Sequence, residues 1–139
     1  SGKKELHALT DKSGSISYTR DVARNLELLL SAGARGTYNM ACLGYATRYD
    51  VARKIVEILG YGGQIRVTAV MSSFFSATFT TPRSASECLV NERLIKDKLS
   101  RMRPWPEALE EYLERDFSYA FNTQTAQSGN ATRSATQSY

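Results

Sequence analysis

Hydrophobic residues recur at helical spacing in two separate stretches of the chain. In each stretch they occupy positions i, i+1, i+4, i+7 and i+8. They are Val22, Ala23, Leu26, Leu29 and Leu30 in the first stretch, and Val51, Ala52, Ile55, Ile58 and Leu59 in the second. Residues with this spacing share one face of a 3.6-residue helix. The pattern predicts two amphipathic helices, one from about Thr19 to Ser31 and one that begins after Thr47.

Both predicted helices have the same four residues, Asp-Val-Ala-Arg, near their N-termini. We expect Thr19 and Thr47 to be the N-caps, with Asp21 placing a negative charge in the first turn and Asp50 completing a capping box. Two copies are too few for a stacked solenoid. We interpret the repeat as two equivalent packing units of an α/β layer, which start alike because the same capping chemistry recurs.

Each predicted helix is followed by glycines and then by a segment that is typical of a strand. These strands are expected at 36–42, GTYNMAC, and at 64–70, QIRVTAV. A loop-like stretch follows at 72–86, and Pro106 suits the first turn of a last helix within 103–117. Further packing residues are expected at Leu89, Leu94, Ile95, Leu99, Ala108, Leu109, Tyr112 and Leu113. The predicted fold class is therefore α/β, with three main helices and short strands.

The composition changes after Phe117. Residues 118–139 are mainly Ser, Thr, Gln, Asn and Ala, with Arg133 as their single charge, and such a segment cannot bury a core. We therefore divide the chain into a folded domain at 1–117 and a low-complexity tail at 118–139, either disordered or added for expression. The chain begins with Ser-Gly instead of Met, which indicates either tag removal or a piece cut from a longer protein.

Composition and charge narrow the classes of function. Hydrophobic residues make up 42% of the chain and charged residues 23%, as in ordinary globular proteins. No apolar run approaches the roughly 20 residues that span a bilayer, so we expect no membrane partner. The net charge is +4, but Lys and Arg are dispersed, so we expect no nucleic-acid partner either.

Cys42 and Cys88 belong to no CxxC motif, which predicts two buried thiols in a reducing, cytoplasmic compartment.

No complete catalytic motif is present in the sequence. His7 is the single histidine, which argues against a His-based metal site or a Ser-His-Asp triad. The glycine cluster at 60–63 follows a predicted helix and precedes a predicted strand, the reverse of a dinucleotide-binding turn. The nearest approach to a Tyr-x-x-x-Lys pair is Tyr49 and Arg53, which would share a helix face. We therefore expect no catalytic, cofactor-binding or metal-binding residues in this chain.

Three segments, taken in order, resemble the dTDP-4-dehydrorhamnose reductase family of the extended short-chain dehydrogenase/reductase superfamily. They are SGSISYTRDVARNLELLL at 13–30, GTYNMACLGYATRYDVARKIVEILG at 36–60, and TPRSASECLVNERL at 81–94 together with MRPWPEALEEYLE at 102–114. The resemblance covers roughly residues 10–116. It is to the C-terminal third of those enzymes only.

The resemblance implies that the chain is the C-terminal, substrate-binding region of an NAD(P)-dependent nucleotide-sugar reductase. The family's NAD(P)H site and its Tyr-x-x-x-Lys pair belong to the missing N-terminal half. The chain is therefore expected to bind no cofactor and to be non-catalytic by itself. The same resemblance places Ser15, Ser17 and Arg83 at the nucleotide-sugar, where a guanidinium is suited to a bidentate phosphate contact.

Alternatives stay open both for these residues and for the function. Ser15 and Ser17 could equally serve the local turn, and Arg83 could be a solvent-exposed residue after a proline turn. The family's Ser-Pro-Thr is replaced here by Ser15-Ile16-Ser17, and the residues after its Thr-Pro are replaced by RSAS at 83–86. The nucleotide-sugar is therefore left undefined. Because some relatives have turned from catalysis to regulation, the alternative function is a non-catalytic regulatory or interaction module of the same fold.

Overall fold

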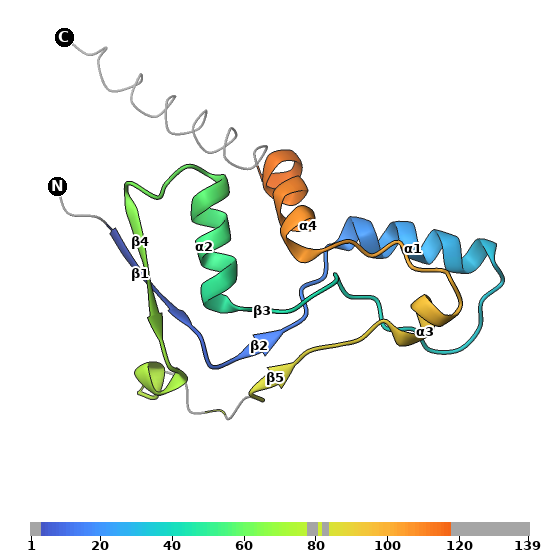
Figure 1. Ribbon diagram of the computed structural model, residues 1–139, viewed down its shortest axis with the longest axis horizontal. Coiled ribbons are helices and arrows are strands. Elements are labelled where there is room, and N and C mark those ends of the chain that lie inside the picture. Colours follow the sequence, from blue (N-terminus) through green and yellow to red (C-terminus); the bar gives the residue numbers. More distant parts are fainter. Residues whose placement is uncertain (1–3, 78–80, 82–83, 118–139) are drawn as a thin grey trace, which may run out of the picture.

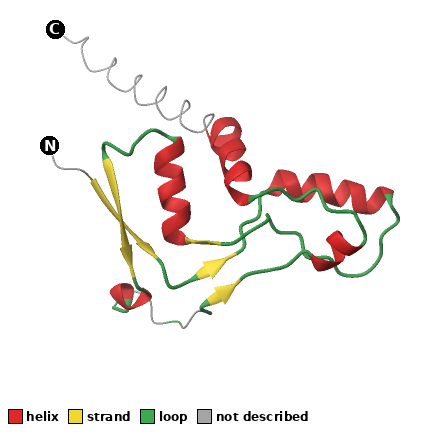
Figure 2. Ribbon diagram, viewed as in Figure 1, coloured by secondary structure: helices red, strands yellow, loops and turns green. Residues whose placement is uncertain are grey.

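The computed structural model describes residues 4–77, 81 and 84–117. At one end of the molecule, β1 (Lys4–Leu9) and β4 (Ile65–Val70) form a parallel pair, and α2 (Arg48–Ile58) packs beside it (Figure 1). Helices and strands are interspersed along the chain and mix in space (Figure 2), so the predicted α/β fold class is confirmed. Within the described ranges, every helix is too short or too polar to cross a bilayer.

A second sheet joins this end to the rest of the molecule. Its central strand, β2 (Ser13–Gly14), pairs antiparallel with β3 (Ala46–Thr47) and parallel with β5 (Ser86–Glu87). Each of these strands is two residues long, which is too short to provide a core of its own. The sheet instead holds three distant parts of the chain in register.

The N-terminus of α2 is closed by the predicted capping box. The Asp50 N–H donates to Thr47 Oγ1 at 3.1 Å, and the Thr47 N–H donates to Asp50 Oδ2 at 2.9 Å. The hydrogen bonds from Thr47 lower the pKa of the Asp50 carboxyl, because they favour its ionised form. After the helix, Gly60 has a φ of +71°, the left-handed conformation that commonly terminates helices. Local chemistry alone therefore accounts for both ends of α2.

Helix α1 (Thr19–Ser31) has the predicted bounds but a different N-terminus from the one expected. Its N-cap is Tyr18, and no side chain makes a cap hydrogen bond there, so the assignment of Thr19 as the N-cap is wrong. Asp21 does lie in the first turn, but its side chain is 1% exposed and accepts a hydrogen bond from Arg103 Nη2 at 2.8 Å. A distant partner therefore neutralises Asp21, in addition to any effect of the helix dipole.

The buried face of α1 also differs from its predicted apolar stripe. Of that stripe, Leu29 is buried and Val22 is partly buried, whereas Leu26 and Leu30 are 45% and 72% exposed. Leu29 packs with Leu94 of α3 (Glu92–Lys96) in a hydrophobic cluster. The cluster also contains Met102 and the partly buried Val22, Ala34, Tyr38, Met40 and Leu99.

Two of the packing residues predicted around α3 do not join this cluster. Leu89 and Ile95 are 54% and 56% exposed, whereas Leu94 is fully buried. Helix α3 is only five residues long, so it turns a single hydrophobic side chain fully toward the core. The expectation that Leu89 and Ile95 pack in the core is therefore wrong.

Residues 36–42, which were predicted to form a strand, have no strand partner. The side chain of Asn91 binds both backbone groups of Ala41: the Ala41 N–H donates to Asn91 Oδ1 at 3.0 Å, and Asn91 Nδ2 donates to the Ala41 carbonyl at 2.6 Å. The Cys42 N–H donates to the Ile16 carbonyl at 2.8 Å. Buried backbone groups need partners of some kind. Here a side chain and a loop supply them, so no ladder forms and the strand prediction is wrong.

Strand β1 was not predicted from the sequence. The segment KELHAL has only a short apolar–polar alternation, and the strand forms because β4, about 60 residues later, offers a parallel partner with Leu6 opposite Val67. His7 lies within this strand and stacks on Phe74 with ring centroids 4.7 Å apart. Phe74 belongs to a 3₁₀ turn, η1 (Ser72–Phe75). Pairing with a distant segment therefore orders this stretch as a strand.

The last helix connects the second core cluster to α1. Helix α4 (Trp105–Glu111) has Pro106 in its first turn, as predicted, and continues as a π-helical turn, η2 (Tyr112–Phe117). The second cluster contains Tyr18, Cys42 and Ala108, with Trp105 packed against it. Ion pairs add to this contact, since Arg103 reaches Glu111 at 2.7 Å and Arg20 reaches Asp116 at 3.0 Å.

Candidate substrate-facing site

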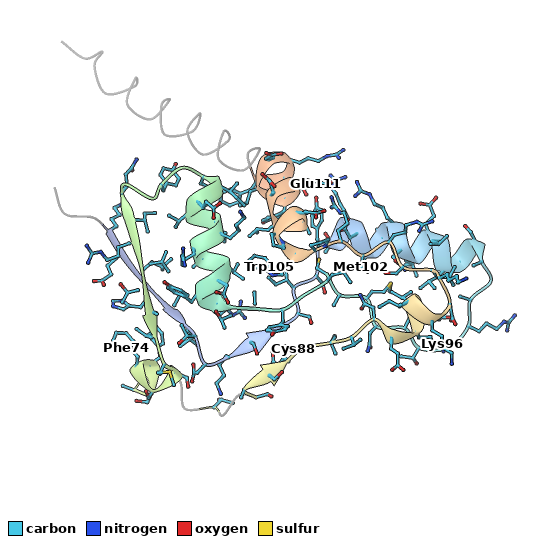
Figure 3. The ribbon with its side chains drawn as sticks, viewed as in Figure 1. Phe74, Cys88, Lys96, Met102, Trp105 and Glu111 are labelled. Atoms are coloured by element: carbon cyan, nitrogen blue, oxygen red, sulfur yellow. The ribbon has the colours of Figure 1, made fainter. Side chains whose placement is uncertain are left out.

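The loop that carries Ser15 and Ser17 lies beside residues 84–89, which follow Arg83 in the sequence. They flank the β2–β5 pair: the Ser13 N–H donates to the Ala85 carbonyl at 3.1 Å, and the Ser15 N–H donates to the Glu87 carbonyl at 3.3 Å. Figure 3 shows Cys88 at the same place, just beyond β5. Residues about 70 positions apart therefore form one continuous loop surface, which we call the β2–β5 loops (residues 14–17 and 84–89).

The position of these loops in the fold is typical of a ligand site. β1 and β4 are parallel, so both of their carboxyl ends, at Leu9 and Val70, lie at the same edge of the pair. The chain passes from these two ends into the β2–β5 loops. In α/β proteins, ligands commonly bind beyond the carboxyl ends of parallel strands.

A short hydrogen-bonded link holds the two chain segments together where they leave this edge. Asp11 accepts hydrogen bonds from the backbone N–H and the hydroxyl of Ser72, at 3.0 and 2.5 Å. The Ser72 hydroxyl bond is the main cause of the lowered pKa of the Asp11 carboxyl, because it stabilises the ionised form. At neutral pH, Asp11 is therefore a carboxylate that ties the segment after β1 to the segment after β4.

Ser15 is engaged within the fold. The Leu89 N–H donates to Ser15 Oγ at 2.8 Å, and the Ser15 hydroxyl lies 3.3 Å from the Leu89 carbonyl oxygen. One of the two acceptor sites of the hydroxyl therefore remains for a ligand. The contacts agree with a local structural role, and they leave room for the predicted substrate contact.

Ser17 is exposed, and its hydroxyl donates to the Met40 carbonyl at 3.4 Å, a long and weak hydrogen bond. The hydroxyl can thus rotate toward a ligand at small cost. Arg83, the third predicted site residue, lies outside the described residues. Its role stays a prediction.

The Arg53 guanidinium lies 5.7 Å from the centre of the Tyr49 ring, so the two side chains do share a helix face, as predicted, and form a cation–π contact.

Cys42 and Cys88 are both unpaired thiols, but only Cys42 is buried. The expectation of two buried thiols is therefore wrong for Cys88, which lies on the exposed β2–β5 loops. Burial is the main cause of the raised pKa of the Cys42 thiol.

The glycine cluster at 60–63 does not provide a nucleotide-binding turn. It follows the C-terminus of α2 and precedes β4, so the backbone N–H groups at a helix N-terminus, which would hold a pyrophosphate, do not face it. Among the residues that the structure describes, no group of three His, Cys, Asp or Glu side chains could hold a metal ion. No sequence pattern placed Asp11, Cys88 or Leu89 at this site, because their positions depend on strand pairing.

A model of the family described as the RmlD substrate binding domain matches residues 1–117. A protein named spore coat polysaccharide biosynthesis protein SpsK, from Bacillus subtilis, is 33% identical over 112 residues. That alignment covers 81% of this chain but 38% of the relative. The chain thus spans less than two fifths of the length of this relative.

Solved structures agree with the sequence relatives. A dTDP-4-dehydrorhamnose reductase from Clostridium acetobutylicum superposes with a TM-score of 0.73 at 27% identity, covering 81% of this chain and 39% of that one. A second dTDP-4-dehydrorhamnose reductase, from Bacillus anthracis and in complex with NADP, has a TM-score of 0.69 at 22% identity and covers 81% and 38% of the two chains. The resemblance stated from the sequence is therefore confirmed, and it extends to only part of each relative.

Proposed function

The chain belongs to the RmlD substrate binding domain family, and from this we propose that it is the substrate-binding portion of an NAD(P)-dependent nucleotide-sugar reductase. The observation that carries the proposal is the family match over residues 1–117. A solved relative of the same fold is a dTDP-4-dehydrorhamnose reductase in complex with NADP. The reaction in question is the reduction of a keto-sugar by NAD(P)H, in an aqueous, cytoplasmic setting.

In this reaction the chain's own residues bind and orient the sugar nucleotide. The β2–β5 loops offer the Ser17 hydroxyl and the remaining acceptor site of Ser15. Arg83 supplies a planar guanidinium that can form two parallel hydrogen bonds to a phosphate. Holding the substrate in one orientation makes the later hydride transfer effectively intramolecular.

The cofactor does not fit the residues that the structure describes. The glycine turn at 60–63 lies at the wrong end of a helix, and Tyr49 has Arg53 in place of the lysine of a Tyr-x-x-x-Lys pair. The hydride and proton transfers therefore belong to the nucleotide-binding portion of the reductase.

A titration with NADPH tests whether this chain binds the cofactor by itself. The chain alone is expected to show no saturable change in the fluorescence of Trp105 up to high micromolar NADPH, because its described residues form no pyrophosphate-binding turn. The positive control is a chimera in which this chain replaces the matched portion of the Clostridium acetobutylicum reductase. Saturable micromolar binding by the chain alone would contradict the proposal.

The Arg83→Ala substitution in this chimera tests the substrate site. The loss of a charge-assisted hydrogen bond should cost about 1.5–3 kcal/mol, which is about a ten- to hundredfold rise in KM for the nucleotide-sugar. NADPH affinity should stay the same. The matched control is Arg66→Ala, since Arg66 is an exposed arginine on β4. If KM is unchanged by Arg83→Ala, Arg83 is a surface residue and the site assignment fails.

A further inference from the structure

The apolar residues of α1 are not centred on the face that the fold buries. At about 100° per residue, the residues Leu29, Val22, Leu26, Leu30 and Ala23 follow one another as a continuous apolar arc around the helix. Only one end of this arc is covered, because Leu29 is 6% exposed whereas Leu30 is 72% exposed. The buried side is centred on Asn25, roughly a quarter turn away.

This orientation of α1 buries polar side chains and leaves leucine side chains exposed to water. Asp21 needs Arg103 as a partner, and Asn25 Oδ1 accepts a hydrogen bond from the Arg101 N–H at 2.6 Å. In the described part of the chain, Asn25 Nδ2 is buried without a hydrogen-bond partner, which costs free energy. A surface helix normally turns its apolar stripe toward a packed neighbour. The exposed part of the α1 stripe is therefore a face that lacks its partner.

The surroundings of this face are those of an interface. We call Ala23, Leu26 and Leu30 the outer face of α1. Around the helix, Ala23 is followed by the charged Glu27, which also lines an open hollow of about 480 Å³ on the next side of α1, together with Arg24 and Ser31. An apolar centre with a charged margin is the usual anatomy of a protein interface. Figure 1 shows α1 at the end of the molecule away from β1 and β4, where a large neighbour has access.

We propose that the outer face of α1 is the docking surface for the nucleotide-binding portion of the reductase. This inference rests on the proposed function. The Clostridium acetobutylicum reductase has roughly three fifths of its chain outside the matched portion, since the match covers 39% of it. That remainder is part of the same polypeptide, and two portions of one chain commonly bury 600–1,500 Å² between them, on the order of an inter-domain contact.

A second copy of this chain is a less suitable occupant. Three side chains on one helix are too few for a standard interface, which buries roughly 1,200–2,000 Å². A covalently linked portion needs less area, because the linkage supplies a high effective concentration. The outer face therefore fits a neighbour in the same polypeptide better than a free partner.

The experiment compares the double variant Leu26→Ser/Leu30→Ser in the chain alone and in the chimera. In the chain alone we expect the melting temperature to stay within about 1 °C, because both side chains are already exposed. In the chimera we expect it to fall by about 5 °C or more, since the two leucines become buried there. Ile95→Ser is the matched control, because Ile95 is a similarly exposed residue on α3, and it should change neither protein.

Equal shifts in the two proteins would overturn the proposal. It would also be overturned if the chain alone were a dimer by light scattering and the double variant a monomer, because the occupant would then be a second copy. A second measurement uses methyl spectra of the labelled chain with the nucleotide-binding portion of the same reductase added in trans. We expect shifts at Leu26 and Leu30 but not at Ile95, and unmoved leucine signals would contradict the docking. A calorimetric titration of the chimera with a nucleotide-sugar measures substrate binding, and it therefore tests the proposed function independently of the docking.

Discussion

Replacement of Arg103 by methionine is expected to destabilise the domain by about 3–5 kcal/mol, the range for breaking a buried ion pair. Asp21 is 1% exposed, and Arg103 forms three hydrogen bonds to its carboxylate, at 2.8 to 3.2 Å. The variant would leave that carboxylate in the interior with Arg24 as its remaining ion-pair partner, at 3.3 Å. Urea denaturation followed by circular dichroism measures the loss.

Two variants act as controls for the Arg103 result. Arg101→Met removes a neighbouring exposed guanidinium, which contacts the Ser100 carbonyl at 3.4 Å, and should change stability by less than about 0.5 kcal/mol. Adding Asp21→Asn to Arg103→Met should recover part of the loss, because the unpaired charge is removed. A loss below about 1 kcal/mol in the single variant would mean that Arg24 alone is a sufficient partner for Asp21.

The same ion-pair network has a pH dependence that the Arg103 variant should weaken. The hydrogen bond from Arg103 is the largest cause of the lowered pKa of Glu111, and that from Arg20 is the largest cause for Asp116. A carboxyl whose pKa is lowered by folding stabilises the fold above its unfolded pKa, near 4.5 for Glu111. That contribution is lost as the pH falls through the folded value. Arg103→Met should therefore flatten the fall in stability below about pH 4.5.

Leu94→Ala should destabilise the domain by about 2–5 kcal/mol, the range for removing a buried leucine side chain. Leu94 is fully buried, and it packs between Leu29 of α1 and Met102. Helix α3 is five residues long, and Leu94 is its one buried residue. The substitution would therefore leave a cavity between α3 and α1. Ile95→Ala, at the adjacent and 56% exposed position, should cost much less. Equal losses at the two positions would contradict this account of the core.

The elements that the sequence predicted correctly are those whose causes are local. The capping box of Thr47 and Asp50, the glycine stop at Gly60 and the proline in the first turn of α4 all involve groups within four residues of one another. Local groups meet in any fold, so their chemistry can be read without knowledge of the rest of the chain. The bounds of α1, the position of β4 and the α/β fold class followed in the same way.

Contacts between distant residues decided the rest. Asn91 binds the backbone of Ala41 and prevents a strand ladder there, whereas β4 gives Lys4–Leu9 a partner and makes it a strand. Neither result is visible in the periodicity of the segment itself. The β2–β5 pairing likewise brings Ser15 beside Leu89, a proximity for which the sequence between them holds no signal.

The orientation of α1 shows most clearly the difference between what local sequence determines and what distant contacts decide. The sequence determined that 19–31 is a helix with an apolar arc, because hydrogen bonding along a helix and the spacing of its side chains are local properties. It did not determine which part of the arc is buried. Arg103 and the backbone of Arg101 bind Asp21 and Asn25, and they turn the helix so that Leu26 and Leu30 stay in water. Only the tertiary structure could decide this, because the orientation of a helix depends on partners supplied by distant parts of the chain.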